Sequence, residues 1–189
     1  MNKLEEILEF NRQFVAEKEY TTLQATKYPD KKMVILTCMD ARLLELLPRA
    51  MNLRNGDVKM IRNAGAVVSH PFGSVMRSIL LSIVDLGAEE VFVIGHHDCG
   101  MYRADPNSLK EKIVKHGIDP ERISMLEHAG IDLDRWLSGF DSVEDSVRNS
   151  VSMIRNHPLM PRGTAVHGLV IHPATGELTV VENGYLAEK

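Results

Sequence analysis

Short apolar segments alternate along this chain with a segment of helical periodicity, and this alternation limits the fold classes open to it. Residues 33–37, 58–61 and 91–94 are short runs of aliphatic and β-branched residues, which are typical of buried strands. Between the second and third runs, apolar residues recur at helical spacing over residues 75–84. Strands that alternate with helices predict an α/β fold with a mostly parallel central sheet, flanked by helices.

The C-terminal third of the chain predicts a helix followed by two closely spaced strands. The helix is expected to open at Asp141, with Asp141 and Glu144 forming a capping box. The two strand-like runs, residues 166–171 and 178–181, are joined by a short connection that contains proline and glycine. So short a connection favours a hairpin, because a parallel pair needs a long crossover. We therefore expect an antiparallel strand at one edge of the sheet.

The N-terminal segment is expected to be a helix outside the main fold. Apolar residues between Leu4 and Val15 fall on one helical face, so this helix should pack against something beyond the sheet. The sequence contains no internal repeat and no sign of a second domain. We predict a single domain over residues 1–189, composed of an N-terminal helical arm (1–30) and an α/β core (31–189).

The composition excludes several classes of protein. The chain has 189 residues, of which 44% are hydrophobic and 25% charged, as in an ordinary globular domain. A formal net charge of −4, with no basic run, argues against a nucleic-acid partner. No apolar stretch approaches the roughly 20 residues that span a bilayer, so no membrane association is expected. The N-terminus lacks the apolar centre of a signal peptide, which favours a cytoplasmic location.

Two cysteines and one histidine stand at the predicted ends of strands. Cys38 directly follows the first strand, and His96 and Cys99 follow the third. If these strands are neighbours in a parallel sheet, the three side chains converge on one edge of it. Two thiolates and an imidazole suit zinc, and three protein ligands leave a fourth position for water, as in catalytic sites. The alternative is a pair of buried thiols that pack as small hydrophobic groups.

Asp40 and Arg42 follow Cys38 closely and complete the candidate site. Arg42 can hold the carboxylate of Asp40 by paired, charge-assisted hydrogen bonds. Two thiolates nearly neutralise the charge of zinc, so a bound water is acidified less than at a site with three histidines. A carboxylate beside the metal would then orient that water. A structural ion pair is the alternative, and the two roles are compatible.

Together, these motifs resemble those of the beta-class carbonic anhydrases, above all the small prokaryotic and archaeal members. The resemblance rests on Cys38-x-Asp40-x-Arg42, on His96-x-x-Cys99, and on the segment 62–65 between them. It implies one Zn(II) per subunit with Cys38, His96 and Cys99 as ligands, and Asp40 and Arg42 as the catalytic pair. It also implies a homodimer or a dimer of dimers, in which the N-terminal helix extends to the partner subunit.

The activity that the resemblance implies is the reversible hydration of carbon dioxide to bicarbonate and a proton, through a zinc-bound hydroxide. Two alternatives stay open: a hydrolase of carbonyl sulfide or carbon disulfide on the same site, or a non-catalytic zinc or redox-sensing protein. The sequence also leaves open whether Asp40 or water is the fourth ligand. His97 could shuttle protons or line the site, and the role of Asp98 is equally open.

Overall fold

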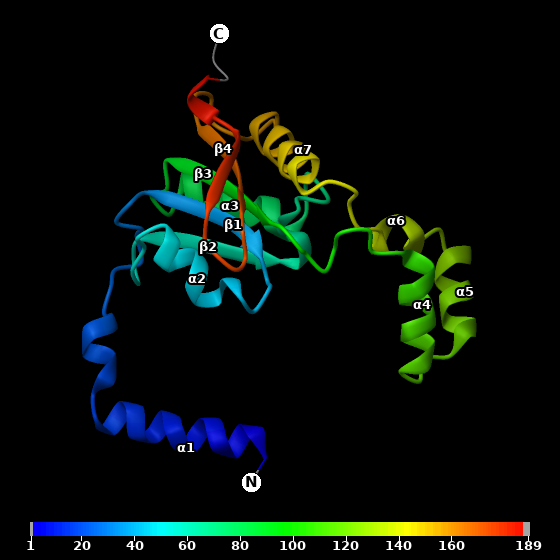
Figure 1. Ribbon diagram of the computed structural model, residues 1–189, viewed down its shortest axis with the longest axis horizontal. Helices are drawn as coiled ribbons and strands as arrows, with labels where there is room; N and C mark the ends of the chain where they lie inside the picture. Colours follow the sequence, from blue (N-terminus) through cyan, green and yellow to red (C-terminus); the bar gives the residue numbers. More distant parts are fainter. Residues whose placement is uncertain (1, 187–189) are drawn as a thin grey trace.

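A five-stranded sheet forms the centre of the computed structural model, which describes residues 2–186 (Figure 1). The strands lie in the order β2-β1-β3-β4-β5. Their bounds are Met33–Cys38 for β1, Val58–Asn63 for β2, Glu90–His96 for β3, Ala165–Ile171 for β4 and Leu178–Glu182 for β5. The first four strands are parallel, and β5 runs antiparallel to β4 at the edge. The predicted single α/β domain, with its antiparallel edge strand, is confirmed.

Some helices cover the two faces of this sheet, and others lie outside it (Figure 1). Their bounds are Lys3–Ala16 for α1, Leu43–Ala50 for α2, Ser74–Val84 for α3, Pro106–Lys115 for α4, Pro120–His128 for α5, Leu133–Leu137 for α6 and Val143–Arg155 for α7. The predicted start of α7 was wrong by one residue. Ser142 is the N-cap, since its hydroxyl accepts a hydrogen bond from the main-chain N–H of Asp145.

The strand β1 lies between two hydrophobic layers, one on each face of the sheet. Its side chains alternate between the faces, so that Val34 and Leu36 pack with α3 and α7, whereas Ile35 packs with Leu43 and Leu47 of α2. All five of these side chains are fully buried. A parallel strand covered on both faces must be apolar throughout, which explains the uninterrupted apolar run in the sequence.

Two glycines allow α7 to approach the sheet closely. A Cβ at Gly95 of β3 would lie 2.7 Å from a methyl carbon of Val143, and a Cβ at Gly168 of β4 would lie 2.7 Å from one of Val147. Neither distance is tolerable for real atoms, so side chains at these positions would push the helix away. The contact places α7 against β3 and β4, next to the end of β3 that carries His96.

Two groups of helices project from the sheet (Figure 1). None of the residues of α1 is buried within the described part of the chain, although the helix carries several large apolar side chains. The helices α4 to α6 form a second group at the side, and Lys110 of α4 forms ion pairs with Glu127 and Asp134 of the other two helices. Among residues 2–186, no helix combines the length and the apolar character needed to cross a membrane.

Candidate metal centre

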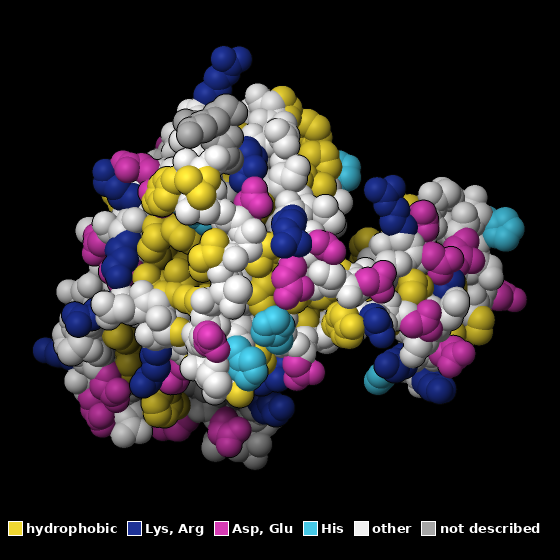
Figure 2. Space-filling view, turned by 45° about the horizontal axis from the view of Figure 1, so that its top comes forward, with side chains coloured by type: hydrophobic (Ala, Val, Ile, Leu, Met, Phe, Trp, Pro, Cys, Tyr) yellow, Lys and Arg dark blue, Asp and Glu magenta, His cyan; other side chains and the backbone are white. Residues whose placement is uncertain are grey.

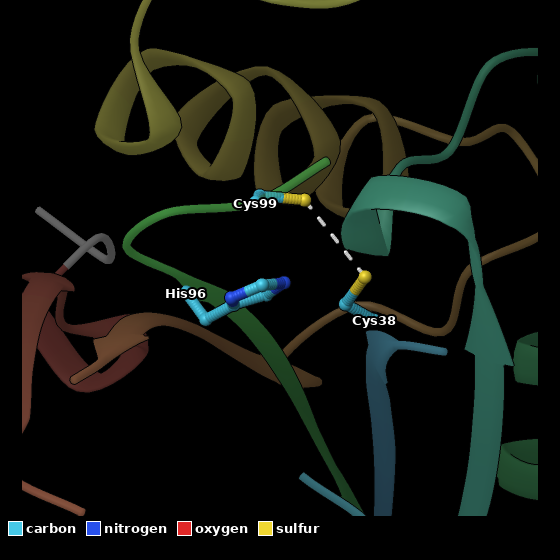
Figure 3. A group of neighbouring side chains, drawn as sticks. All are labelled: Cys38, His96 and Cys99. Carbon is cyan, nitrogen blue, oxygen red and sulfur yellow. Dashed lines mark hydrogen bonds between the residues drawn. The ribbon is translucent and has the colours of Figure 1, made fainter. Parts of the chain in front are cut away.

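The three predicted ligands converge at the carboxyl edge of the sheet. Cys38 ends β1, His96 ends β3, and Cys99 lies in the loop that follows. Because β1 and β3 are adjacent and parallel, their ends meet, and the side chains point toward one another (Figure 3). Their ligand atoms all lie within 4.8 Å of one another. Within residues 2–186, no other group of three or more His, Cys, Asp or Glu side chains is arranged to hold a metal ion.

The distances and hydrogen bonds at this centre fit a tetrahedral zinc ion. The two Sγ atoms are 3.9 Å apart, and two zinc–sulfur bonds of about 2.3 Å at the tetrahedral angle require a separation of about 3.8 Å. The Nδ1–H of His96 donates to the carbonyl oxygen of His97 at 2.8 Å. Its Nε2 is buried and has no hydrogen-bond partner in the described chain, so its lone pair is free for a metal.

The surroundings of the two thiols differ. Burial opposes ionisation of Cys38, but the neighbouring imidazole of His96 and a hydrogen bond from the main-chain N–H of Gly65 lower its pKa to about 7. Burial raises the pKa of Cys99 to about 11, and the nearby charge of Cys38 adds to this effect. For His96, burial disfavours the imidazolium, yet its interaction with Cys38 outweighs burial and raises the pKa. Metal binding would replace these protons with one cation.

Asp40 and Arg42 form the expected ion pair next to this centre. The Nε and Nη2 groups of Arg42 donate to the two carboxylate oxygens of Asp40 at 3.0 and 2.9 Å. These hydrogen bonds lower the pKa of Asp40 to about 2, so the carboxylate is ionised at neutral pH. One carboxylate oxygen lies 3.9 Å from Nε2 of His96, which places Asp40 beside the proposed metal position.

Arg62 also belongs to the site, although the sequence assigned it no role. Its Nε donates to the main-chain oxygen of Cys38 at 3.1 Å, and its Nη2 donates to that of Asp40 at 2.9 Å. Arg62 therefore holds the loop that carries both residues. The available signal was the motif segment 62–65 at the end of β2, but only the pairing of Thr37 with Arg62 in the sheet shows which loop the side chain reaches.

The remaining residues of interest lie outside the ligand set. His97 is exposed, and its ring centroid is 6.1 Å from that of His172. His157 and His167 are buried, and neither joins the ligand group. Beside the site, a cavity of about 1200 Å³ extends from the end of β2 toward α6. Its lining includes the apolar side chains of Val67 and Phe140.

The fold and the centre together define a class: an α/β protein with two cysteines and one histidine, arranged so that they could hold a metal ion, at the carboxyl edge of a parallel sheet. The carbonic anhydrase family model matches residues 33–178 of this chain. The crystal structure of beta-carbonic anhydrase isoform I from Trichomonas vaginalis has a TM-score of 0.89 and 36% identity, covering 98% of this chain and 100% of that one. The chain belongs to the beta-carbonic anhydrase family.

Relatives within the family carry different names. The Bacillus subtilis protein named "Putative carbonic anhydrase YtiB" is 57% identical over 185 residues, which cover 98% of this chain and 99% of that protein. A carbon disulfide hydrolase from Acidithiobacillus thiooxidans is more distant. It is 28% identical over 158 residues, which cover 79% of this chain and 76% of the hydrolase.

Proposed function

We propose that this protein is a carbonic anhydrase that holds one Zn(II) per chain through Cys38, His96 and Cys99. The observation that carries the proposal is the ligand geometry: two sulfur atoms 3.9 Å apart and a buried, unpartnered imidazole nitrogen. The ionised carboxylate of Asp40 lies directly beside these atoms. A purely structural zinc site has four protein ligands, whereas this group supplies three and leaves a position for water.

The residues around the metal position have separate roles in the proposed reaction. When bound, the zinc ion acts as a Lewis acid that lowers the pKa of a water molecule, so that a nucleophile is available near neutral pH. With the metal in place, Asp40 would accept a hydrogen bond from this water and would direct an oxygen lone pair toward the carbon of carbon dioxide. Arg42 keeps Asp40 ionised and in place. The new carbon–oxygen bond yields bicarbonate, and one proton passes to solvent.

Carbon dioxide is apolar, so it needs an apolar surface near the metal rather than a charged pocket. The large cavity supplies such a surface through Val67, Met101 and Phe140, and the last two also pack against the buried cluster that contains Cys38 and Cys99. Two of these positions are close in sequence to the site, since Met101 follows Cys99 by two residues and Val67 follows the segment 62–65.

Hydrolysis of carbonyl sulfide or carbon disulfide is the alternative that one specific observation favours, since a carbon disulfide hydrolase is among the relatives. That relative is 28% identical, whereas the Trichomonas vaginalis beta-carbonic anhydrase is 36% identical over nearly the whole chain. Carbon dioxide is therefore the preferred substrate in this proposal. A non-catalytic zinc or redox-sensing role would need no carboxylate beside the metal. The position of Asp40 beside His96 therefore favours the catalytic role.

We also propose that the chain functions in the cytoplasm as a homodimer or a dimer of dimers, with residues 1–30 as an arm that packs on the partner subunit. The support is an exposed apolar surface on α1. The side chains of Leu4, Ile7 and Phe10 are exposed in the single chain. Figure 2 shows further hydrophobic side chains gathered on the surface of the described part of the core, residues 31–186, whereas the group of α4 to α6 carries many charged side chains. Apolar patches of this kind mark protein–protein contacts.

The proposal is tested by measuring metal content and turnover on the same preparations. Wild-type protein is expected to contain one zinc per chain and to hydrate carbon dioxide in stopped-flow assays, with carbon disulfide and carbonyl sulfide assayed in parallel. His96→Gln is expected to lose the zinc, whereas His97→Gln, the adjacent imidazole, should retain it. Zinc-loaded wild type that releases sulfide but hydrates carbon dioxide poorly would favour the hydrolase, and no turnover of any of the three would favour the non-catalytic role.

A further inference from the structure

The loop between two of the proposed ligands, His96 and Cys99, contains a carboxylate that the proposed mechanism does not use. Asp98 has a φ of 54°, in the left-handed region that few side chains adopt, although aspartate tolerates it. Its side chain is 82% exposed to solvent, and it is not among the ligand atoms of the centre. This conformation turns the side chain and the main-chain carbonyl of Asp98 toward the loop after β1.

Both of these groups contact Arg42. The Nη1 of Arg42 donates to a carboxylate oxygen of Asp98 at 2.8 Å, and Nη2 donates to the main-chain oxygen of Asp98 at 2.9 Å. Nε and Nη2 donate at the same time to the two carboxylate oxygens of Asp40. All three guanidinium nitrogens are thus engaged, along two edges of a planar group. A planar group held along two edges can neither rotate nor slide.

This arrangement links the two loops that carry the proposed ligands. Arg42 belongs to the loop after β1, which carries Cys38 and Asp40, whereas Asp98 belongs to the loop after β3. With Asp40 alone as partner, the guanidinium would be tied only to its own loop, two residues away. Asp98 ties it to the loop of His96 and Cys99. The position of Asp40 is thereby fixed relative to the proposed ligands on both loops.

We propose that Asp98 is a positioning residue, which fixes Arg42 and thereby holds the carboxylate of Asp40 beside the metal centre. This inference rests on the proposed function, because it assigns Asp98 a task in that reaction. An exposed ion pair contributes little to stability, so the effect of Asp98 is on geometry rather than on folding. A small misplacement of a group that orients a reactant lowers the rate strongly.

The experiment compares Asp98→Gly with Asp98→Asn in zinc-loaded protein. Glycine accepts the left-handed conformation but removes the carboxylate, whereas asparagine keeps an oxygen acceptor and also tolerates that conformation. For Asp98→Gly we expect kcat to fall roughly tenfold, with KM and zinc content unchanged. A crystal structure of this variant should show Arg42 displaced and the separation of Cys38 and Cys99 retained. Asp98→Asn should stay within about threefold of wild type.

A double-mutant cycle separates positioning from greater flexibility of the loop. If Asp98 acts through Arg42, then Asp98→Gly adds no further loss in an Arg42→Gln background. An unchanged kcat in Asp98→Gly, an additive loss in the double variant, or loss of zinc would each overturn the inference. Inactive wild-type protein would instead refute the proposed function. In that case the position of Arg42 in the crystal structure of Asp98→Gly still decides whether Asp98 holds it.

Discussion

Asp40 is held by Arg42 in a way that separates its role from that of the proposed metal ligands. Its two carboxylate oxygens accept hydrogen bonds from a guanidinium, and its pKa is lowered to about 2. The residue is therefore a permanent anion in the neutral pH range and can act only as an acceptor. A group of this kind orients a water molecule but does not store a proton at that pH.

Replacing Asp40 should thus reduce turnover without releasing the metal. In Asp40→Asn the side chain keeps its shape, but its amide can present a donor where the carboxylate presents an acceptor. We expect kcat for carbon dioxide hydration to fall about a hundredfold, with one zinc per chain retained. Glu45→Gln, a charge removal on the exposed face of α2, serves as the matched control and should leave kcat unchanged. Loss of zinc in Asp40→Asn would show that Asp40 is itself a ligand.

At the scale of the elements, the site depends on how closely α7 packs against the sheet. Gly95 directly precedes the proposed ligand His96, and the space above it is filled by Val143 and Val147. Neither the sequence pattern of α7 nor that of β3 indicates this contact, because each predicts only its own element.

Gly95→Ala should therefore be strongly destabilising, because its Cβ would lie 2.7 Å from Val143 and 2.9 Å from Val147. We expect the free energy of unfolding to fall by about 1–3 kcal/mol, as for other overpacked cores. Urea denaturation of metal-free proteins measures it. Gly100→Ala is the control, since no atom lies within 4 Å of the added Cβ, and its effect should stay within about 0.5 kcal/mol. Equal stability of the two variants would contradict the packing argument.

The short helical segment Gly184–Leu186 is attached to the sheet by a histidine far from the metal centre. Nδ1 of His167 accepts a hydrogen bond from the main-chain N–H of Gly184 at 3.1 Å, and its ring stacks on Phe92. Burial lowers the pKa of His167, and the carboxylate of Glu90 only partly offsets this effect. The folded state therefore favours the neutral ring.

This predicts a specific pH dependence of stability. Below about pH 6.5 the unfolded chain binds a proton at His167 more readily than the folded chain does, so the free energy of unfolding decreases as the pH falls. His167→Asn, which keeps an acceptor near the Nδ1 position, should remove part of this decrease. Urea denaturation of both proteins at several pH values between 5.5 and 7.5 measures the difference in slope. Identical slopes would show that His167 does not contribute.

At the scale of the whole molecule, α1 is a helix with an apolar face, and within residues 2–186 none of its residues is buried. A helix of 14 residues is marginally stable in water unless its apolar face is buried. The proposed partner subunit would supply that cover. Because the apolar side chains are spread along the helix, several of them should contribute to the contact.

Removing the arm should therefore change the oligomeric state before it changes the fold of the core. We expect a chain that begins at residue 24, without α1 and the segment Glu19–Leu23, to have a smaller mass in light scattering than the full chain. Leu4→Glu together with Ile7→Glu should act in the same direction, whereas Glu6→Gln should not. A full-length chain that is monomeric at micromolar concentration would refute the proposed arm.

The strands of this protein and the residue types of its candidate centre could be predicted from the sequence alone. Apolar periodicity predicted all five strands, because burial on one or both faces determines which residues of a strand are apolar. The placement of Cys38, His96 and Cys99 after predicted strands indicated that they would converge at one sheet edge if those strands were neighbours. The helix α2 was not predicted, because it is short and contains Pro48.

Which distant groups meet around that centre depends on how the strands are ordered in the folded chain. Arg62 reaches the main chain of Cys38 only because β2 is adjacent to β1 in the register that pairs Thr37 with Arg62. Arg42 reaches Asp98 only because β1 is also adjacent to β3. Such contacts depend on strand order and register, which arise from the packing of the whole sheet. No local pattern of residues contains that information.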